Sequence, residues 1–452
     1  MRRALNPTPL AAAVILLGIA LQVSDGFYVP SAFRMLIAVA VLCTIGLAGL
    51  GNRVVPWLRA EPVLVGIMTA GMLLNLVALA LAPPGLYLAR PEGFNHASLL
   101  VGVVSAALLT LVIAWGRAVR YAFLALLATY VGLGVWLIHA SPNPQIDVMT
   151  VHKAAIEALF NGESPYAISF DNIYERKDEF YSPEVLAGGR VQFGLPYPPL
   201  SLLMTIPGQV LGGDIRYAEL VALAIGAACI GLMQASRVAP LAAGLMLFTP
   251  RTLFILEQGW TEALAICWLG VTVFAASRGL AILPIAFGLL LAVKQYLAVA
   301  LPLGYLLIRP PFDWRRVWSL IGPALLVVIV FTLPFIIWDP WGFMRSVIWL
   351  QLIEPFRLDS LSVLSALARA GWPAEGVWLA LAPAVAVVVG LLFSWLVAPR
   401  SPAGFAASLG FTLLLTFMFG KKAFCNYYFF IIAALVTAIA AERATRRDID
   451  TA

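Results

Sequence analysis

Charged side chains are scarce in this sequence. Aspartate, glutamate, lysine and arginine make up only 12% of its 452 residues, whereas hydrophobic residues make up 62%. Soluble domains carry about 25% charged residues, so the composition excludes an ordinary soluble protein. The long apolar runs instead predict an all-α polytopic membrane protein.

Cysteine and histidine are few as well, and neither type is clustered. Three of the four cysteines lie inside apolar runs and the fourth begins one: Cys43, Cys229, Cys267 and Cys425. The three histidines are too far apart in the sequence to suggest a metal site: His96, His139 and His152. Motifs of phosphate-binding loops, zinc proteases and serine hydrolases are absent. The sequence therefore predicts no disulfide framework, no metal ligands and no cofactor.

The net charge of +6 does not come from a basic patch. Lysines and arginines stand singly or in pairs between apolar runs, which argues against a nucleic-acid partner. Basic residues in the short connections of a membrane protein instead mark its cytoplasmic side. We therefore expect a multi-pass protein of the inner (plasma) membrane, with both termini cytoplasmic and membrane lipids around it.

Apolar windows predict about 14 spans within a single integral membrane domain, residues 1–452. They lie near 9–25, 32–50, 63–82, 98–115, 121–139, 198–212, 217–235, 260–277, 280–293, 295–308, 317–338, 375–397, 402–419 and 425–441. The basic N-terminus resembles a signal peptide without a cleavage site, so we expect an uncleaved first span. Segment 238–256 satisfies the alternation of sides only as a broken or re-entrant hairpin, and the span at 198–212 is short and contains Pro207.

Two long segments, 140–197 and 339–374, fall on the outer side of this topology. The first holds eight of the 23 acidic residues and is punctuated by aromatic residues and prolines, which favours a functional loop over a plain linker. The second holds tryptophans, prolines and Arg357, and forms either an interfacial helix with a cover that closes over bound substrate, or an ordinary interfacial hairpin.

Asp147 follows a pair of prolines and begins an amphipathic stretch in the first outer segment. Polar side chains recur at helical spacing on one face and apolar ones on another: Asp147, Thr150, Lys153 and Glu157, against Val148, Val151, Ala155 and Leu159. The pattern predicts a helix in the membrane interface. Asp147 has two interpretations: an N-cap of this helix, or a carboxylate that accepts a proton as a general base.

Lys294 lies between two apolar runs, with Gln295 and Tyr296 beside it. An ionisable side chain at such a position faces a polar interior, or it extends to the headgroups. Tyr197 follows and precedes prolines in "GLPYPPL" and is either an aromatic-belt anchor or the wall of a binding pocket.

Two further groups of polar residues flank apolar runs. On an expected helix 257–274, Gln258 and Glu262 are four residues apart and would share a face near Glu257. These residues form either a solvated helix start or a binding cluster. In "FGKKAFCNYYFF", Lys421, Lys422 and Tyr427 lie on the expected outer side. They form either an anion-binding group or a belt of lysines that extend to the headgroups.

The order of these segments resembles the GT-C superfamily, most closely its bacterial mannosyltransferase-like members. The resemblance rests on the acid before an interfacial helix, then "LPYPPLSLL", "EQGWTEAL" and "LLLAVKQYLAVALPL", and covers roughly residues 140–310. These polytopic enzymes transfer sugars from polyprenyl-phosphate donors. The resemblance implies a GT-C-type bundle of about 12–14 helices with an outer catalytic loop, and a lipid-linked or envelope glycan as acceptor.

The resemblance also implies roles for individual residues. Asp147 would be the base, and Lys294 with Lys421 or Lys422 would bind the carrier phosphate, with Arg357 a further cation near it. Sugar or acceptor hydroxyls would be bound by a wider set: Tyr197, Glu257, Gln258, Glu262, Gln295 and Tyr427. Many members carry a paired acid, whereas Asp147 stands alone here, so a divalent metal is possible but not supported. The alternatives are a flippase of lipid-linked sugars and an envelope glycan polymerase or ligase.

Overall fold

A computed structural model of the chain describes residues 4–52, 56–82, 84–89, 104, 117–174, 180–308, 311, 313–373 and 375–442. This part of the chain is mainly helical, as the composition predicts. Six of its helices are long and apolar enough to cross a membrane: α1 (Pro7–Ser24), α2 (Pro30–Ala48), α3 (Glu61–Leu81), α5 (Arg117–Ala140), α15 (Trp314–Trp338) and α19 (Trp378–Val397). Apart from residue 104, the expected span at 98–115 lies outside the described residues, as does His96.

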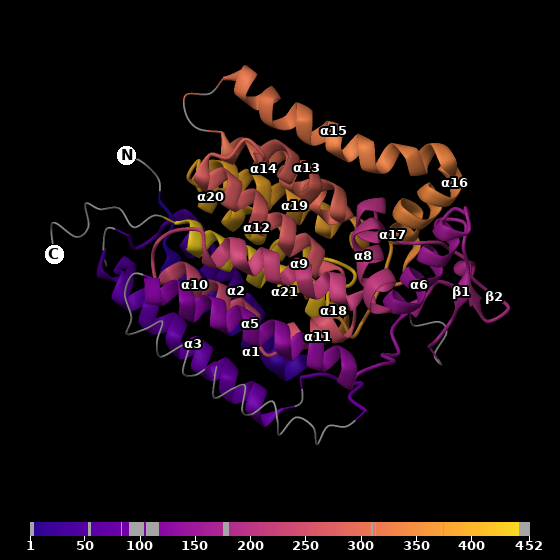
Figure 1. Cartoon of the computed structure of the whole chain (residues 1–452), viewed down its shortest axis with the longest axis horizontal. Helices are drawn as coiled ribbons and strands as arrows, with labels where there is room; N and C mark the ends of the chain where they lie inside the picture. Colours follow the sequence, from indigo (N-terminus) through magenta and orange to yellow (C-terminus); the bar gives the residue numbers. More distant parts are fainter. Residues whose placement is uncertain are drawn as a thin grey trace.

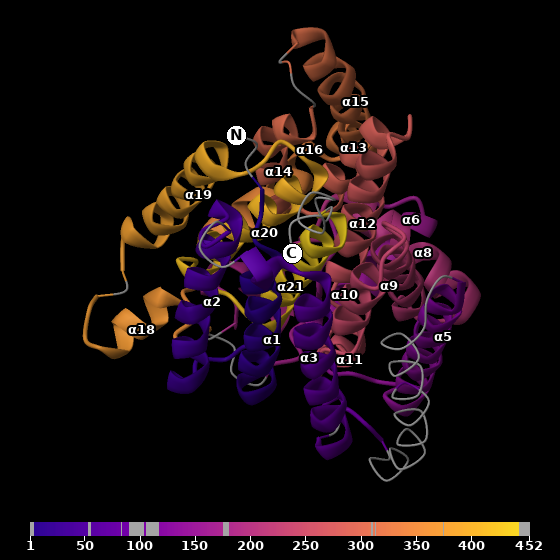
Figure 2. The same cartoon turned by 90° about the vertical axis from the view of Figure 1, so that its left-hand side faces the viewer.

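Shorter helices complete the assembly. They are α6 (Asp147–Phe160), α8 (Pro199–Gly212), α9 (Arg216–Gly231), α10 (Val238–Leu247), α11 (Thr252–Glu257), α12 (Glu262–Arg278), α13 (Leu283–Val293), α14 (Ala300–Leu303), α16 (Pro340–Phe343), α17 (Leu350–Ile353), α18 (Val363–Arg369), α20 (Pro402–Met418) and α21 (Cys425–Ala441). Short 3-10 turns at Pro56–Arg59, Pro183–Val185, Gln295–Val299 and Gly304–Leu307 and a π-helix at Met344–Trp349 join some of them. Figure 2 shows α1, α2 and α3 side by side.

One end of the helical assembly, called here the N-terminal end, gathers the start of α1 and the end of α21. The side-chain amide of Asn52 donates to the carbonyl of Ala4 at 3.1 Å. Arg59 lies 3.7 Å from Glu442, and the side chain of Gln234, just after α9, donates to the Glu442 carbonyl at 2.8 Å. The chain therefore begins and ends its described helices at the same end.

The opposite end, called here the loop end, joins the end of α1 to later parts of the chain. Arg251 forms an ion pair with Asp25, and the backbone N–H of Tyr28 donates to the carbonyl of Asp359 at 2.7 Å. Both outer segments expected from the sequence lie at this end, and Figure 1 shows α6, β1, β2, α16 and α17 together on the right of the view.

Helix α8 starts and finishes at the loop end, so the predicted span at 198–212 does not run the length of the assembly. Its 14 residues extend about 21 Å, less than the hydrocarbon core of a bilayer. Arg216, just after it, approaches the carbonyl of Ile138 near the end of α5 at 3.5 Å. A Cβ on Gly208 would meet the backbone of Ala218, so the next helix folds back against α8.

Segment 238–251 also differs from its prediction, but in the opposite sense, because it crosses the assembly where a hairpin was expected. Arg237, just before α10, lies 3.7 Å from Glu61 at the start of α3, whereas Arg251 after α10 reaches Asp25 at the loop end. Segment 238–251 therefore runs from one end to the other, rather than returning as the expected hairpin. The two differences cancel, and the alternation of sides expected from the sequence is kept.

The outer segments form a small layer with its own apolar clusters. The sequence did not predict its sheet of two-residue strands, β1 (Phe170–Asp171), β3 (Arg190–Val191) and β2 (Leu186–Ala187), antiparallel in the order β1-β3-β2. Gly188 and Gly189 both have positive φ, at 57° and 78°, as the two-residue turn between β2 and β3 requires. The hydroxyl of Ser164 donates to Asp339 at 2.9 Å, which ties the two outer segments together.

Candidate functional site

Asp147 is the first residue of α6, as the amphipathic pattern predicts. Ile146 is the N-cap residue and makes no side-chain cap, so the N-cap interpretation of Asp147 is wrong. The carboxylate instead accepts a hydrogen bond from the hydroxyl of Tyr181 at 2.7 Å, and the backbone N–H of Asp147 donates to the hydroxyl of Tyr174 at 3.4 Å. The half-buried carboxylate is therefore oriented by an aromatic wall.

The two tyrosines of this wall stay protonated at neutral pH. Burial, reinforced by the negative charge of Asp147, raises the pKa of Tyr174 and of Tyr181. The rings of Tyr174 and Phe180 stack with their centroids 4.2 Å apart, and Tyr181 packs edge-on to Phe193 at 5.8 Å. Tyr181 is 34 positions from Asp147, and no local sequence pattern indicates the pair.

The backbone around Tyr197 is fixed by two side-chain hydrogen bonds, as its proline-rich segment suggests. The side chain of Gln295 donates to the carbonyl of Pro196 at 2.6 Å, and the hydroxyl of Tyr166 donates to the carbonyl of Tyr197 at 3.0 Å. Gln295 thus holds backbone rather than extending into the site. Burial, together with the charge of Asp147, raises the pKa of Tyr197.

His152 packs on Tyr197 and was not among the predicted site residues. Its ring lies 5.2 Å from the Tyr197 ring, and its Nδ1 lies 2.8 Å from the carbonyl of Val148. Because a carbonyl only accepts, Nδ1 carries the proton, and the buried Nε2 has no hydrogen-bond partner among the described residues. Burial lowers the pKa of His152 to about 4. A histidine four residues after Val148, on the apolar face of the expected helix, was the available signal.

Lys294 stands at a break between α13 and the following 3-10 turn, with extended backbone (φ −150°, ψ 142°). Its ammonium forms an ion pair with Glu262, and the side-chain amide of Asn426 donates to the same carboxylate oxygen at 3.1 Å. Lys294 is 4% exposed, so it does not extend to the headgroups. Its ammonium also lies 5.4 Å from the centre of the Tyr197 ring.

Lys422 brings a second cation to the same region. It forms an ion pair with Glu354, and its side chain is about a quarter exposed. Burial lowers the pKa of Lys422, but the negative charge of Glu354, with a smaller contribution from Asp147, outweighs that effect, so its pKa is raised. Lys422 is therefore a cation at neutral pH that lies within electrostatic reach of Asp147.

Lys421 and Arg357 are engaged elsewhere. The ammonium of Lys421 donates to the carbonyls of Leu352 at 3.0 Å and Glu354 at 2.6 Å, at the end of α17. The guanidinium of Arg357 donates to both carboxylate oxygens of Asp359, at 2.9 and 2.7 Å. Both cations therefore hold the second outer segment in place.

Glu257 and Gln258 lie apart from Glu262, and the expectation that one helix carries all three is wrong. Helix α11 ends at Glu257. Gly259 has a φ of +61°, which interrupts the helical path before α12 begins at Glu262. The carboxylate of Glu257 accepts the backbone N–H groups of Leu86 at 2.6 Å and of Tyr87 at 2.8 Å. Glu257 therefore fixes the loop that follows α3.

The side chains that converge are called the polar cluster below. Its members are linked by ion pairs, ring contacts or charge interactions: Asp147, Tyr197, Glu262, Lys294, Glu354, Lys422 and Tyr427. They come from six parts of the chain that are far apart in sequence. Chemically, the cluster offers an acceptor for a proton in Asp147 and a partly exposed cation in Lys422. Within the described ranges, no group of three or more histidine, cysteine, aspartate or glutamate residues could hold a metal ion.

Comparisons of the chain with protein-family models, with curated proteins and with solved structures found no match.

Proposed function

We propose that the chain is an inverting glycosyltransferase of the GT-C type, which moves a sugar from a polyprenyl-phosphate donor to a lipid-linked or envelope glycan acceptor. The observation that carries the proposal is an acid held in place by Tyr181 and Tyr174, together with a partly exposed cation, Lys422, whose charge interacts with that of Asp147. A transfer of this kind needs a base for the acceptor hydroxyl and a cation for the departing phosphate. The sequence resemblance to GT-C enzymes names the same acid.

The reaction follows from these two groups. The Asp147 carboxylate removes the proton of the acceptor hydroxyl while its oxygen attacks the anomeric carbon. The bond from that carbon to the phosphate oxygen breaks, and polyprenyl phosphate leaves with the electron pair. Inversion follows because attack and departure occur on opposite faces of the sugar. The hydroxyl of Tyr181 occupies one carboxylate oxygen, so the acceptor hydroxyl binds the other or displaces it.

Lys422 is a better candidate than Lys294 for the phosphate. Lys422 is partly exposed, whereas Lys294 is buried and paired with Glu262. In this proposal, Lys294 neutralises Glu262 and positions the ring of Tyr197, and Lys422 leaves Glu354 to stabilise the charge that develops on the leaving phosphate.

The proposed setting is the inner (plasma) membrane, with about 12–14 spans, cytoplasmic termini and the polar cluster at the outer face. Arg59, Arg237 and Arg278 support this orientation. Each has its partner at the N-terminal end: Glu442, Glu61 and the carbonyl of Leu232. Basic connections favour the cytoplasmic side, which puts the loop end outside.

The test is sugar transfer in membranes that contain the wild type, Asp147→Asn or the control Asp171→Asn, supplied with radiolabelled polyprenyl-phosphate hexoses and pentoses. Asp171 is an outer-segment acid paired with Arg190 on the surface, at 2.5 Å. We expect Asp147→Asn to bind donor and to lose transfer by about 100-fold or more, and Asp171→Asn to match the wild type. Transfer by Asp147→Asn at the wild-type rate would refute the base assignment. If wild type moves labelled lipid across the membrane without consuming it, the flippase alternative replaces the enzyme.

A further inference from the structure

The segment after α15 presents an exposed apolar stripe. Helix α15 itself is only 11% buried over its apolar window, and Figure 1 shows it along the top of the assembly. From its last turn onward, exposed side chains continue at helical spacing: Ile337, Trp341, Met344, Ile348 and Leu352, each between 45% and 76% exposed. The stripe therefore extends the lipid-facing surface of α15 into the second outer segment.

The other side of this segment is packed on the protein. Phe343, Val347 and Leu350 are buried in the apolar clusters of the outer layer. The buried hydroxyl of Ser346 accepts the backbone N–H of Gly194 at 2.9 Å. One face is thus fixed against the outer layer, and the stripe is exposed on the other side of the segment.

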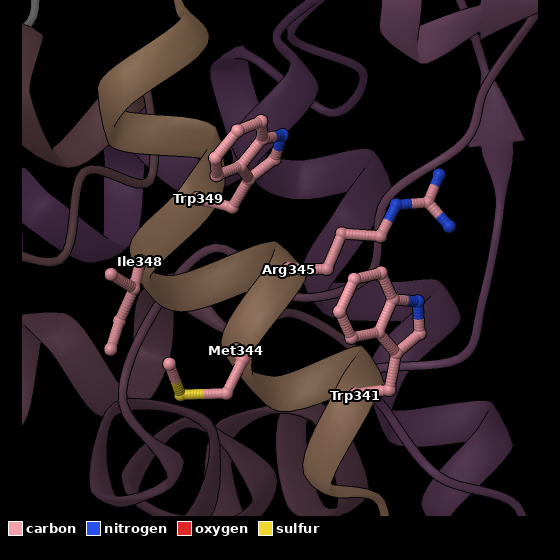
Figure 3. A pocket seen from close by; sticks show the side chains of 5 residues that line it. All are labelled: Trp341, Met344, Arg345, Ile348 and Trp349. Atoms are coloured by element: carbon pink, nitrogen blue, oxygen red, sulfur yellow. The ribbon is translucent and has the colours of Figure 1, made fainter.

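A pocket of about 380 Å³ opens on the exposed face, lined by Trp341, Met344, Arg345, Ile348 and Trp349. This volume falls within the range of small-molecule sites, about 300–1,000 Å³. Figure 3 shows Arg345 and Trp341 extending to one side of the segment, with Met344 and Ile348 on the other. Arg345 is the one charged residue among the side chains that line the pocket, and no described residue supplies it with an ion pair or a hydrogen bond.

The backbone of the pocket has an unusual conformation that favours a functional site. Met344–Trp349 forms a π-helix, a rare conformation that is frequent at functional sites. Trp341, Arg345 and Trp349 follow one another four residues apart, so Arg345 lies between two exposed tryptophans along the segment. Tryptophan is enriched at the level of lipid headgroups, and arginine there attracts anionic lipid.

We propose that this pocket binds an anionic phospholipid of the surrounding bilayer. Arg345 binds the phosphate, the two indoles flank the headgroup, and Met344 and Ile348 contact the upper part of the acyl chains. Charge complementarity and continuity with the lipid-facing surface of α15 favour this occupant. The site does not depend on the proposed transfer reaction, because none of its five lining residues belongs to the polar cluster.

The test is native mass spectrometry of the full chain after purification from nanodiscs that contain equal amounts of dioleoylphosphatidylglycerol and dioleoylphosphatidylcholine. We expect the wild type to retain the anionic phosphatidylglycerol preferentially, and Arg345→Gln to weaken that binding about fivefold. Met344→Glu adds a negative charge at an exposed position and should have the same effect. Arg190→Gln, which removes an exposed arginine of the other outer segment, should bind as the wild type does.

Circular dichroism of each variant establishes that its helices are retained. Equal retention of both lipids by the wild type would overturn the proposal, as would wild-type preference in Arg345→Gln. Displacement of phosphatidylglycerol by equimolar polyprenyl phosphate would also overturn the proposal, because the pocket would then be a binding site for the carrier lipid.

Discussion

Lys294 and Glu262 form an ion pair in the interior of the helical assembly, between the break after α13 and the first turn of α12. A second oxygen of Glu262 is buried without a hydrogen-bond partner among the described residues, so the pair is tightly enclosed. Single and double substitutions of Lys294 and Glu262 test whether the two side chains stabilise the protein as a pair.

Removal of one member should destabilise the protein more than removal of both. Lys294→Met or Glu262→Gln leaves an uncompensated buried group, which costs about 3–5 kcal/mol. The double variant Lys294→Met/Glu262→Gln should recover most of that loss. Thermal unfolding in detergent measures this, and additive losses in the double variant would show that the two side chains do not act as a pair.

Lys422 and Glu354 allow phosphate binding to be separated from structure. Lys422→Met should raise the KM for the donor about tenfold or more, because a hydrogen bond to a charged group is lost. Glu354→Gln breaks the same ion pair but keeps the ammonium, so its donor KM should stay near the wild-type value. Steady-state transfer assays distinguish the two. If both variants raise KM equally, Lys422 serves only to hold Glu354.

His152 should make stability fall in mild acid. Burial holds the pKa of the folded-state imidazole at about 4, below the ordinary value of 6.5. Above pH 6.5 both states are neutral at this position. As the pH falls from 6.5 towards 4, the unfolded state binds a proton that the folded state does not, and stability falls by up to about 1.4 kcal/mol per pH unit. His152→Gln should remove this component between pH 7 and pH 5, whereas the control His139→Gln, at an exposed residue, should behave as the wild type does.

Glu257 should prove to be a structural residue. Its carboxylate accepts two backbone N–H groups of the loop after α3, so Glu257→Gln should lower stability by about 1–3 kcal/mol. Transfer per folded molecule should be unchanged. Glu157→Gln, at an exposed glutamate of α6, serves as the control for unfolding. A loss of transfer in folded Glu257→Gln would return Glu257 to the binding residues.

The sequence carried much of the fold, because composition and apolar run length determine a membrane class whatever the tertiary packing. The start of a helix at Asp147 and the break at Lys294 could also be predicted from the sequence. Prolines mark the first, and an isolated charge between apolar runs marks the second. Segments 198–212 and 238–256 were misassigned because both are apolar and contain prolines. Which of them runs between the ends depends on contacts such as Arg251 with Asp25, far apart in sequence.

The candidate site was predictable only in part. Helical periodicity placed Glu257 with Glu262, but the positive φ of Gly259 separates them, and a glycine inside an expected helix was the missed signal. Tyr181, Glu354 and Asn426 join Asp147, Lys422 and Glu262 through tertiary contacts that no local pattern encodes.

The turn between α20 and α21 supplies Lys422, and α21 supplies Asn426 and Tyr427. During synthesis, the ribosome therefore delivers Asp147, Glu262 and Lys294 long before the groups that complete their surroundings. A nascent chain that stops before residue 420 holds the acid without the lysine that the proposed reaction requires. In the proposed reaction, transfer therefore requires α20 and α21 to have docked, because the turn between them supplies Lys422.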